Sequence, residues 1–317
     1  MSARRVSTPI TVRKLLREAR SRLRGARITH GHGLATAQDE AAFLVAHALG
    51  IQPAALPRVL SRAATPREQR LALWLIDARI RRRIPVAYLT HEAWFGGLQF
   101  YVDRRVIVPR SFIAGLLAQR LQPWLRQPRR VRRALDLCTG SGCLAVLLAK
   151  HFPQARIDAV DISRAALTVA KRNLSLHRVG RRVRLLRSDV FSALRGNRYD
   201  LIVANPPYVS AGAMRKLPRE YRHEPRLALA GGSDGLDIAR KILREAAAHL
   251  TKDGVLVVET GHHRRRVERA FPDLPFTWPV TGAGDDCVFL LERAELPAPK
   301  DLPRGRATRA VAASRRR

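Results

Sequence analysis

The second half of the chain alternates between apolar segments with strand character and amphipathic segments with helical character. In chain order, the predicted strands and helices are residues 134–137, 144–150, 156–160, 165–177, 183–186, 201–204, 236–250 and 255–259. Strands that alternate with helices predict a mostly parallel sheet covered on both faces, which is an α/β fold. Residues 276–280 and 286–292 have no obvious helix between them, so we expect them to close the sheet as an antiparallel pair.

Residues 1–85 repeat apolar side chains at helical spacing and contain no strand pattern. The first predicted helix begins at Thr8-Pro9, and the second is entered through Thr36 and Asp39 before its apolar stretch at 41–49. The third begins at Thr65, whose spacing from Glu68 is that of a capping box. Trp74 in the third helix, and Trp94 further along, are expected to pack against their neighbours. This part of the chain is predicted to be a small helical domain.

A short extended region separates the helical part from the α/β part. Residues 86–89 and 98–102 are β-prone and flank Gly96-Gly97, which predicts a hairpin, with a further strand at 106–109 and a helix at 113–121. The residues from Pro297 on lack periodicity and are predicted to be disordered. We therefore divide the chain into a helical domain (1–85), a β-hairpin linker (86–110), an α/β domain (111–294) and a basic tail (295–317).

Composition excludes several classes of protein. The 317 residues include 46% apolar residues, enough for a real core, so the net charge of +33 does not indicate a disordered polycation. The chain has only three cysteines, a small and odd number that argues against a disulfide framework. This favours a reducing compartment. The longest apolar run, residues 143–149, is far shorter than the ~20 residues of a membrane span. We expect a soluble, cytoplasmic protein without a secretory signal or a membrane partner.

The first motif with chemical content lies between the first α/β strand and the helix that follows it. Glycines at such a turn let the backbone approach a ligand at the carboxyl edge of the sheet, although a tight turn alone also favours glycine. No Gly-Lys-Ser/Thr follows, so the loop is not a phosphate-binding P-loop. The residues of this motif that we single out are Asp136, Cys138, Thr139, Gly140 and Gly142.

Two further acidic residues follow the next two strands. Asp161 is placed to accept hydrogen bonds from ribose hydroxyls, and Asp189 is placed to accept one from an adenine amino group. Each alone is more simply a loop carboxylate. Their joint placement with the glycine loop, at three successive strand ends, predicts a nucleoside pocket.

The most specific motif is Asn205-Pro206-Pro207-Tyr208, directly after an apolar strand. The prolines end the strand and remove two backbone donors, which leaves carbonyl oxygens as acceptors. Together with the side-chain oxygen of Asn205, these carbonyls can hold both hydrogens of a planar –NH2 group, and Tyr208 can pack on its face. A nitrogen held in this way is oriented for methyl transfer.

These motifs, in this order, resemble the S-adenosylmethionine-dependent methyltransferases of the seven-stranded Rossmann-like class, and more closely the protein-glutamine N5-methyltransferases. The resemblance covers everything but the tail. It implies that Gly140, Gly142 and their loop contact the methionine part of S-adenosyl-L-methionine, while Asp161 holds the ribose and Asp189 the adenine. The resemblance also implies that Asn205 and the carbonyl of Pro206 hold the substrate amide. On this basis the cofactor-binding residues are Asp136, Cys138, Thr139, Gly140, Gly142, Asp161, Asp189 and Asn205, and the catalytic residues are Asn205, Pro206, Pro207 and Tyr208.

The family has one branch that modifies peptide release factors and one that modifies large-subunit (50S) ribosomal protein three. Three segments resemble the ribosomal branch: residues 84–95, the Val-Pro-Arg-Ser of 108–111 followed by Phe112-Ile113, and residues 221–225. Release-factor enzymes usually continue Pro-Arg-Pro-x-Thr-Glu at the second of these. We therefore expect ribosomal protein three to be the substrate, with a release factor as the alternative.

Two other classes stay open. A DNA or RNA adenine N6-methyltransferase would use the same Asn-Pro-Pro-Tyr chemistry on a flipped base, but the chain has no insertion large enough for a target-recognition domain. A non-enzymatic RNA-binding assembly factor fits the arginines but leaves the pocket motifs unexplained. No metal site is expected, because His262-His263 has no acidic or cysteine partner at ligand spacing and favours a solvated loop.

Basic residues are unevenly distributed. Of the 59 basic residues 52 are arginines, and residues 1–85 hold 17 basic against 5 acidic residues. The expected substrate is itself basic, so attraction to it does not explain the surplus. Contact with rRNA in an assembling ribosome, through the helical domain and the tail, and an arginine-rich genome both remain as explanations.

Overall fold

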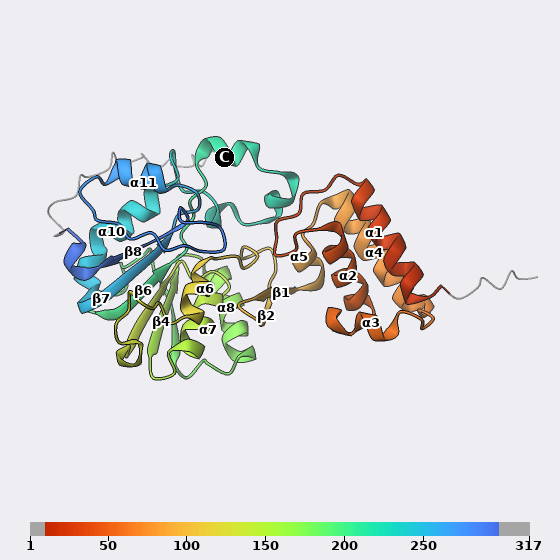
Figure 1. The fold of residues 1–317 in the computed structure, drawn as a ribbon, viewed down its shortest axis with the longest axis horizontal. Helices are drawn as coiled ribbons and strands as arrows, with labels where there is room; N and C mark the ends of the chain where they lie inside the picture. The colour runs from red at the N-terminus through yellow and green to blue at the C-terminus, as the bar shows by residue number, and fades with distance from the viewer. Residues whose placement is uncertain (1–9, 298–317) are drawn as a thin grey trace, which may run out of the picture.

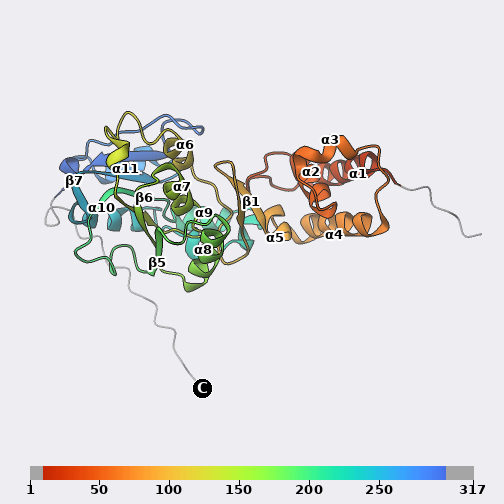
Figure 2. The same ribbon diagram turned by 90° about the horizontal axis from the view of Figure 1, so that it is seen from below.

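The computed structural model describes residues 10–297, which form a helical lobe and a sheet lobe joined by a short linker (Figure 1). Seen from below, the two lobes lie at opposite ends of the molecule (Figure 2). The elements of the helical lobe are α1 (Val12–Gly25), α2 (Ala37–Ala48), the 3-10 turn η1 (Pro53–Ala55), α3 (Leu56–Val59) and α4 (Pro66–Arg82).

The helical lobe follows the sequence pattern closely. Leu15, Ala19 and Leu23 of α1 are buried in one cluster with residues of α2 and α4. The capping box that begins α4 is confirmed, because Thr65 accepts from the backbone of Glu68 and the Glu68 carboxylate accepts from Thr65 N. Helix α1, however, is capped by Thr11, and the predicted start at Thr8-Pro9 lies outside the described residues.

The linker contains a hairpin, but with different strands from those predicted. Strands β1 (Glu92–Phe95) and β2 (Leu98–Tyr101) pair antiparallel, whereas the predicted strand at 86–89 is wrong and is helix α5 (Val86–Thr90). Proline precedes this helix, and the Thr90 hydroxyl donates to the Val86 carbonyl at 3.0 Å, which stabilises the turn. The predicted strand at 106–109 is also wrong, because Val108 N donates to the Glu224 carboxylate rather than to a strand partner.

The sheet lobe contains six strands in the order β5-β4-β3-β6-β7-β8, and only β8 runs antiparallel to its neighbour. Side chains alternate between its faces: Leu201 and Val203 pack with α6 and α7, whereas Ile202 and Ala204 pack with α10 and α11. The strands are β3 (Arg133–Leu137), β4 (Arg156–Asp161), β5 (Val183–Arg187), β6 (Tyr199–Ala204), β7 (Leu250–Glu259) and β8 (Val288–Glu292). The helices and 3-10 turns are α6 (Ile113–Ala118), η2 (Pro128–Arg130), α7 (Cys143–His151), α8 (Arg164–Leu176), α9 (Ala211–Lys216), η3 (Arg219–His223), η4 (Arg226–Ala228), α10 (Asp237–His249), α11 (Arg264–Ala270) and η5 (Arg293–Glu295).

The predicted α/β class with a mostly parallel sheet is confirmed, with one difference at the last strand. Residues 276–280 contribute a single antiparallel bridge, from Thr277 to Leu290, in place of a full seventh strand. Leu296 packs against the sheet lobe, while residues 298–317 of the predicted tail lie outside the described residues.

Candidate active site

The loops after four neighbouring parallel strands meet at the carboxyl edge of the sheet and line one cavity, which we call the first cavity. Strands β3, β4, β5 and β6 supply these loops, as the predicted parallel topology requires. Of the residues predicted to bind a cofactor, those in the wall of the first cavity are Cys138, Gly140, Asp161, Asp189 and Asn205.

Asp161 holds the glycine loop in place. Its carboxylate accepts from Gly140 N at 2.9 Å and from Ser163 N at 2.8 Å. Gly140 has φ of +54°, a left-handed conformation that glycine adopts without strain. Burial raises the pKa of Asp161, while the backbone hydrogen bonds oppose the rise. The ends of β3 and β4 therefore form one rigid wall.

Asp136, Thr139 and Gly142 lie behind this wall rather than in it. Asp136 is fully buried and accepts from Thr139 Oγ1 at 2.5 Å and from Ala145 N at 3.0 Å, and burial raises its pKa to about 7. A Cβ at Gly142 would lie 3.1 Å from the Cβ of Ala170, so glycine lets α7 and α8 pack closely here. These three residues shape the loop from within.

The first cavity also has apolar walls that the sequence motifs do not indicate. Ile162 and Leu227 line it and are 45% and 58% exposed, unusually open for large apolar side chains. Such side chains fit the flat face of an aromatic base. Asp189 lies at the edge of this cavity and pairs with Lys241, a partner that the sequence analysis did not identify.

A second cavity lies on the other side of the Asn-Pro-Pro-Tyr loop, and Asn205 and Pro207 line both cavities. Pro206 and Tyr208 line the second cavity only. The side-chain nitrogen of Asn205 donates to the Arg110 carbonyl at 3.2 Å. Among the described residues, nothing donates to the side-chain oxygen, which therefore remains an acceptor for a ligand between the two cavities.

Glycines fix Tyr208 from two sides. The space for a Cβ at Gly261 is filled by the Tyr208 ring, 2.8 Å away, and the Tyr208 carbonyl occupies the corresponding space at Gly235. His263 packs edge-on against the ring. Burial, followed by the nearby Glu259 carboxylate, raises the pKa of the Tyr208 phenol, so it remains neutral.

The far wall of the second cavity comes from distant parts of the chain. It includes Thr29 of the helical lobe, Arg110 of the linker and Tyr221 of η3. Arg110 makes two hydrogen bonds to the buried Glu224 carboxylate, at 2.5 and 2.6 Å, and its guanidinium lies 5.4 Å from the centre of the Tyr221 ring. No local motif predicts Thr29 at this site. Arg110 and Tyr221 were noted in the sequence only because their segments resemble one branch of the family.

A cluster of buried charges joins this wall to the helical lobe. Arg79 of α4 is 1% exposed and binds both oxygens of Glu40 at 2.8 and 2.9 Å. Its other contacts are the Glu220 carboxylate of η3 at 3.4 Å and the Thr29 carbonyl at 2.7 Å. The helical lobe is therefore fixed to the wall of the second cavity.

The prediction that two tryptophans are packing residues is wrong. Trp74 and Trp94 are 56% and 43% exposed, and Trp94 Nε1 donates to the Glu92 carboxylate at 2.7 Å. Both tryptophans lie on the solvent side of their elements, α4 and β1. Within residues 10–297, no helix is both long enough and apolar enough to cross a membrane.

Comparison with known proteins decides the family. A model of the PrmC N-terminal domain matches residues 14–90, and a model of the methyltransferase small domain matches residues 114–219. A protein of Bordetella pertussis named ribosomal protein uL3 glutamine methyltransferase is 52% identical over 286 residues, which cover 90% of this chain and 96% of that protein. Proteins with the same name are 50% identical in Neisseria meningitidis (90% of this chain, 94% of that one) and in Burkholderia pseudomallei (91% and 96%).

This chain belongs to the uL3 glutamine methyltransferase family. The PrmC N-terminal model covers the helical lobe from within α1 through α5. The methyltransferase small-domain model covers the sheet lobe from α6 to just beyond the Asn-Pro-Pro-Tyr loop. The predicted resemblance is thereby confirmed, and the chain is a methyltransferase by family.

Proposed function

We propose that this chain transfers a methyl group from S-adenosyl-L-methionine to the side-chain amide nitrogen (N5) of a glutamine in ribosomal protein uL3. The observation that carries the proposal is the shared wall of the two cavities, where no described residue donates to the side-chain oxygen of Asn205. The relatives named uL3 glutamine methyltransferases support the choice of substrate.

The first cavity fits the cofactor. Cys138 and Gly140 flank the place for its methionine part, Asp161 has further lone pairs for ribose hydroxyls, and Ile162 and Leu227 suit the two faces of adenine. Asp189 would receive the adenine amino group beside Lys241. When bound, the cofactor supplies an electrophilic methyl group on a sulfonium sulfur. Asp136, Thr139 and Gly142 act indirectly, through the shape of the loop.

The second cavity fits the glutamine side chain. Asn205 Oδ1 and the Pro206 carbonyl accept the two N–H bonds of its amide, which places the nitrogen at the boundary between the cavities. Pro207 forms that boundary and the neutral Tyr208 packs beside the amide. An amide nitrogen is a weak nucleophile, so its orientation and the two accepted hydrogen bonds are the contribution of the protein. No metal takes part in this step.

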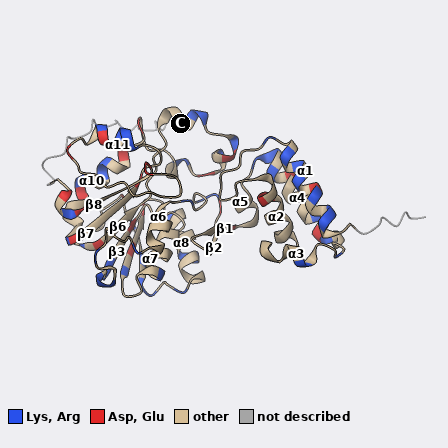
Figure 3. Cartoon of the chain, in the orientation of Figure 1, with Lys and Arg blue, Asp and Glu red and all other residues tan. Residues whose placement is uncertain are grey.

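The parts of the chain then have separate roles. Residues 1–85 recognise the substrate protein, 86–110 link the lobes, 111–294 bind the cofactor and carry out the transfer, and 295–317 are a basic tail. Arg13, Arg17, Arg20 and Arg24 are exposed and repeat along α1, whose ribbon carries many basic residues (Figure 3). We assign this stripe to rRNA in an assembling ribosome, which places the enzyme in the cytoplasm.

The test is a transfer assay with tritiated cofactor and three purified acceptors: uL3, a peptide release factor and RNA or DNA. Label on uL3 alone is the expected result. Label on the release factor alone would show that the chain acts like the release-factor branch of the family. Label only in nucleic acid would contradict the proposal and indicate an adenine methyltransferase. Free uL3 should also accept more label than mature large subunits, where rRNA covers part of its surface.

A further inference from the structure

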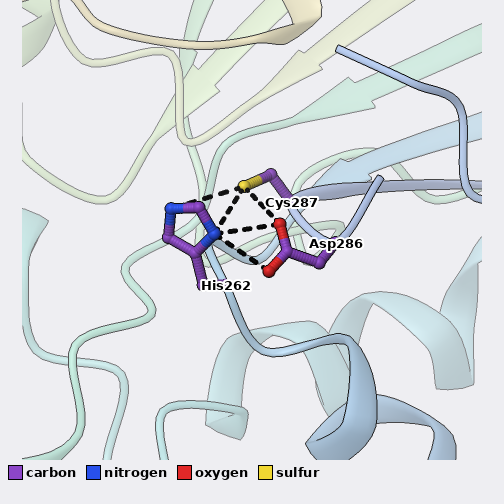
Figure 4. A group of neighbouring side chains, drawn as sticks. All are labelled: His262, Asp286 and Cys287. Carbon is purple, nitrogen blue, oxygen red and sulfur yellow. Dashed lines mark hydrogen bonds and ion pairs between the residues drawn. The ribbon is translucent and has the colours of Figure 1, made fainter. Parts of the chain in front are cut away.

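Three potential metal ligands converge at the end of the sheet, outside both cavities. His262 follows β7, and Asp286 and Cys287 precede β8, so the antiparallel pairing of these strands brings them together (Figure 4). His262 Nδ1 lies 2.9 Å from each Asp286 carboxylate oxygen and 3.4 Å from Cys287 Sγ, and Sγ lies 3.3 Å from Asp286 Oδ1. No local motif predicts this group, because His262 lies 24 residues before Asp286 in the chain.

The separations are close to those around a tetrahedral zinc ion. Bonds of about 2.3 Å to sulfur and about 2.0–2.1 Å to nitrogen and oxygen place tetrahedral ligand atoms roughly 3.3–3.6 Å apart. The two pairs that include Sγ already match this spacing, and only the imidazole and carboxylate must separate by roughly 0.4 Å. His262 is exposed, so its ring has room for that movement.

The same geometry is unsuited to a cysteine nucleophile. A catalytic Cys-His-Asp group needs one ring nitrogen on the thiol and the other on the carboxylate. Here Nδ1 of His262 faces both partners, and Nε2 is 3.9 Å from Sγ. One nitrogen that faces a thiol and a carboxylate together is the arrangement expected of three ligands around a shared cation.

The surrounding charges are mixed. Arg264 is neutralised by Glu268 and Asp285, and the buried Glu259, whose pKa burial raises to about 7, adds negative charge only when it is ionised. Arg265 and Arg266 oppose a cation, which favours an exchangeable ion over a permanently held one. Cys287 is fully buried, so an ion can be reached only from the side of His262 and Asp286.

We propose that His262, Asp286 and Cys287 form a binding site for a thiophilic divalent cation of the Zn²⁺ class, with a fourth position open to solvent. Binding replaces the S–H bond of Cys287 with a sulfur–metal bond and releases that proton to solvent, while His262 binds as a neutral ring. The site adjoins the substrate pocket, because Thr260 N donates to the Cys287 carbonyl and Gly261 packs on the Tyr208 ring.

The experiment uses the full chain without an affinity tag, freed of metal with a chelator and titrated with Co²⁺ as a spectroscopic probe. We expect one equivalent to produce a thiolate-to-cobalt charge-transfer band and to release about one proton. Cys287→Ser should remove the band, and His262→Asn should weaken the affinity at least ~10-fold. His263→Asn is the matched control and should keep the band, because its Nε2 faces the Tyr208 carbonyl instead.

Zn²⁺ should also raise the Tm of the wild type by mass action, whereas Mg²⁺, which prefers oxygen ligands, should not. His262 is exposed, so its variant remains informative even if Cys287→Ser fails to fold. A band that survives in Cys287→Ser would assign the cobalt to Cys138 or Cys143 and overturn the proposal, and an unchanged Co²⁺ affinity in His262→Asn would overturn it too. A wild-type chain without a band would overturn it as well.

Discussion

Asn205 is the residue on which the proposed chemistry depends most directly, because its side-chain amide joins the two cavities. Its nitrogen is bound to the Arg110 carbonyl and its oxygen is left for the substrate. Asn205→Ala should lower the single-turnover rate by roughly 10²–10³-fold, the usual cost of losing a positioned polar group, with little change in cofactor affinity. Rapid-quench kinetics and calorimetry measure the two quantities.

Asp161→Ala is the matched comparison for that experiment and should show the opposite pattern. It removes the carboxylate that holds Gly140, so cofactor affinity should fall first. Loss of cofactor binding in Asn205→Ala, with normal turnover of whatever complex forms, would contradict the role assigned to Asn205.

Glu259 should make stability depend on pH. Burial raises its pKa to about 7, although hydrogen bonds from Ser111 and Phe112 oppose the rise. Between about pH 4.5 and 7 the folded chain retains a proton that the unfolded chain has lost, so stability falls as pH rises, by at most ~1.4 kcal/mol per pH unit. Glu259→Gln should therefore gain stability relative to the wild type from pH 5 to 8 in urea unfolding. Parallel pH profiles for the two proteins would refute this assignment.

At the scale of elements, the buried charge cluster fixes α2 and α4 to η3. Arg79→Met leaves the buried carboxylates of Glu40 and Glu220 without their main partner, which should cost about 3–5 kcal/mol of unfolding free energy. Arg81→Met, on the same helix but 78% exposed, is the matched control and should change stability by less than ~0.5 kcal/mol. Equal effects of the two substitutions, measured by urea unfolding, would show that the cluster does not hold the lobes together.

Elements with a strong local pattern could be predicted from the sequence, and those set by distant contacts could not. The capping box at Thr65 and the strand before Asn205 each lie within a few residues, and both were predicted correctly. Helix α5 was predicted as a strand, because Val86 and its neighbours are β-prone but their structure depends on the preceding proline and on the Thr90 hydroxyl.

The same division applies to the site. The glycine loop, Asp161 and the Asn-Pro-Pro-Tyr loop are contiguous motifs at strand ends, and five of the predicted cofactor residues line the first cavity. Thr29 and Ile162 carry no motif, and their place in the cavity walls follows from packing between distant segments. Asp136 has the sequence position of a ligand contact, but it is fully buried and its Oδ2 accepts both internal hydrogen bonds.

At the scale of the whole molecule, the net charge of +33 should govern how the enzyme binds rRNA. Replacing Arg17 and Arg20 of α1 with glutamine should weaken rRNA binding and reduce the slope of log K against log salt by roughly one to two units. Arg178→Gln with Arg181→Gln, two exposed arginines of the sheet lobe, is the matched control and should have a smaller effect. Filter binding at several salt concentrations makes the comparison. Identical losses would indicate a diffuse charge effect and contradict a stripe dedicated to RNA.

The most direct test of the central claim is tandem mass spectrometry of purified uL3 after reaction with the chain and S-adenosyl-L-methionine. We predict the mass of one added methyl group on the side-chain amide of a single glutamine, and far less of this product from Asn205→Ala in the same reaction time. A methyl group on a lysine, an arginine or the backbone amine of uL3, or unmodified uL3 beside a methylated release factor, would contradict the function proposed for this site.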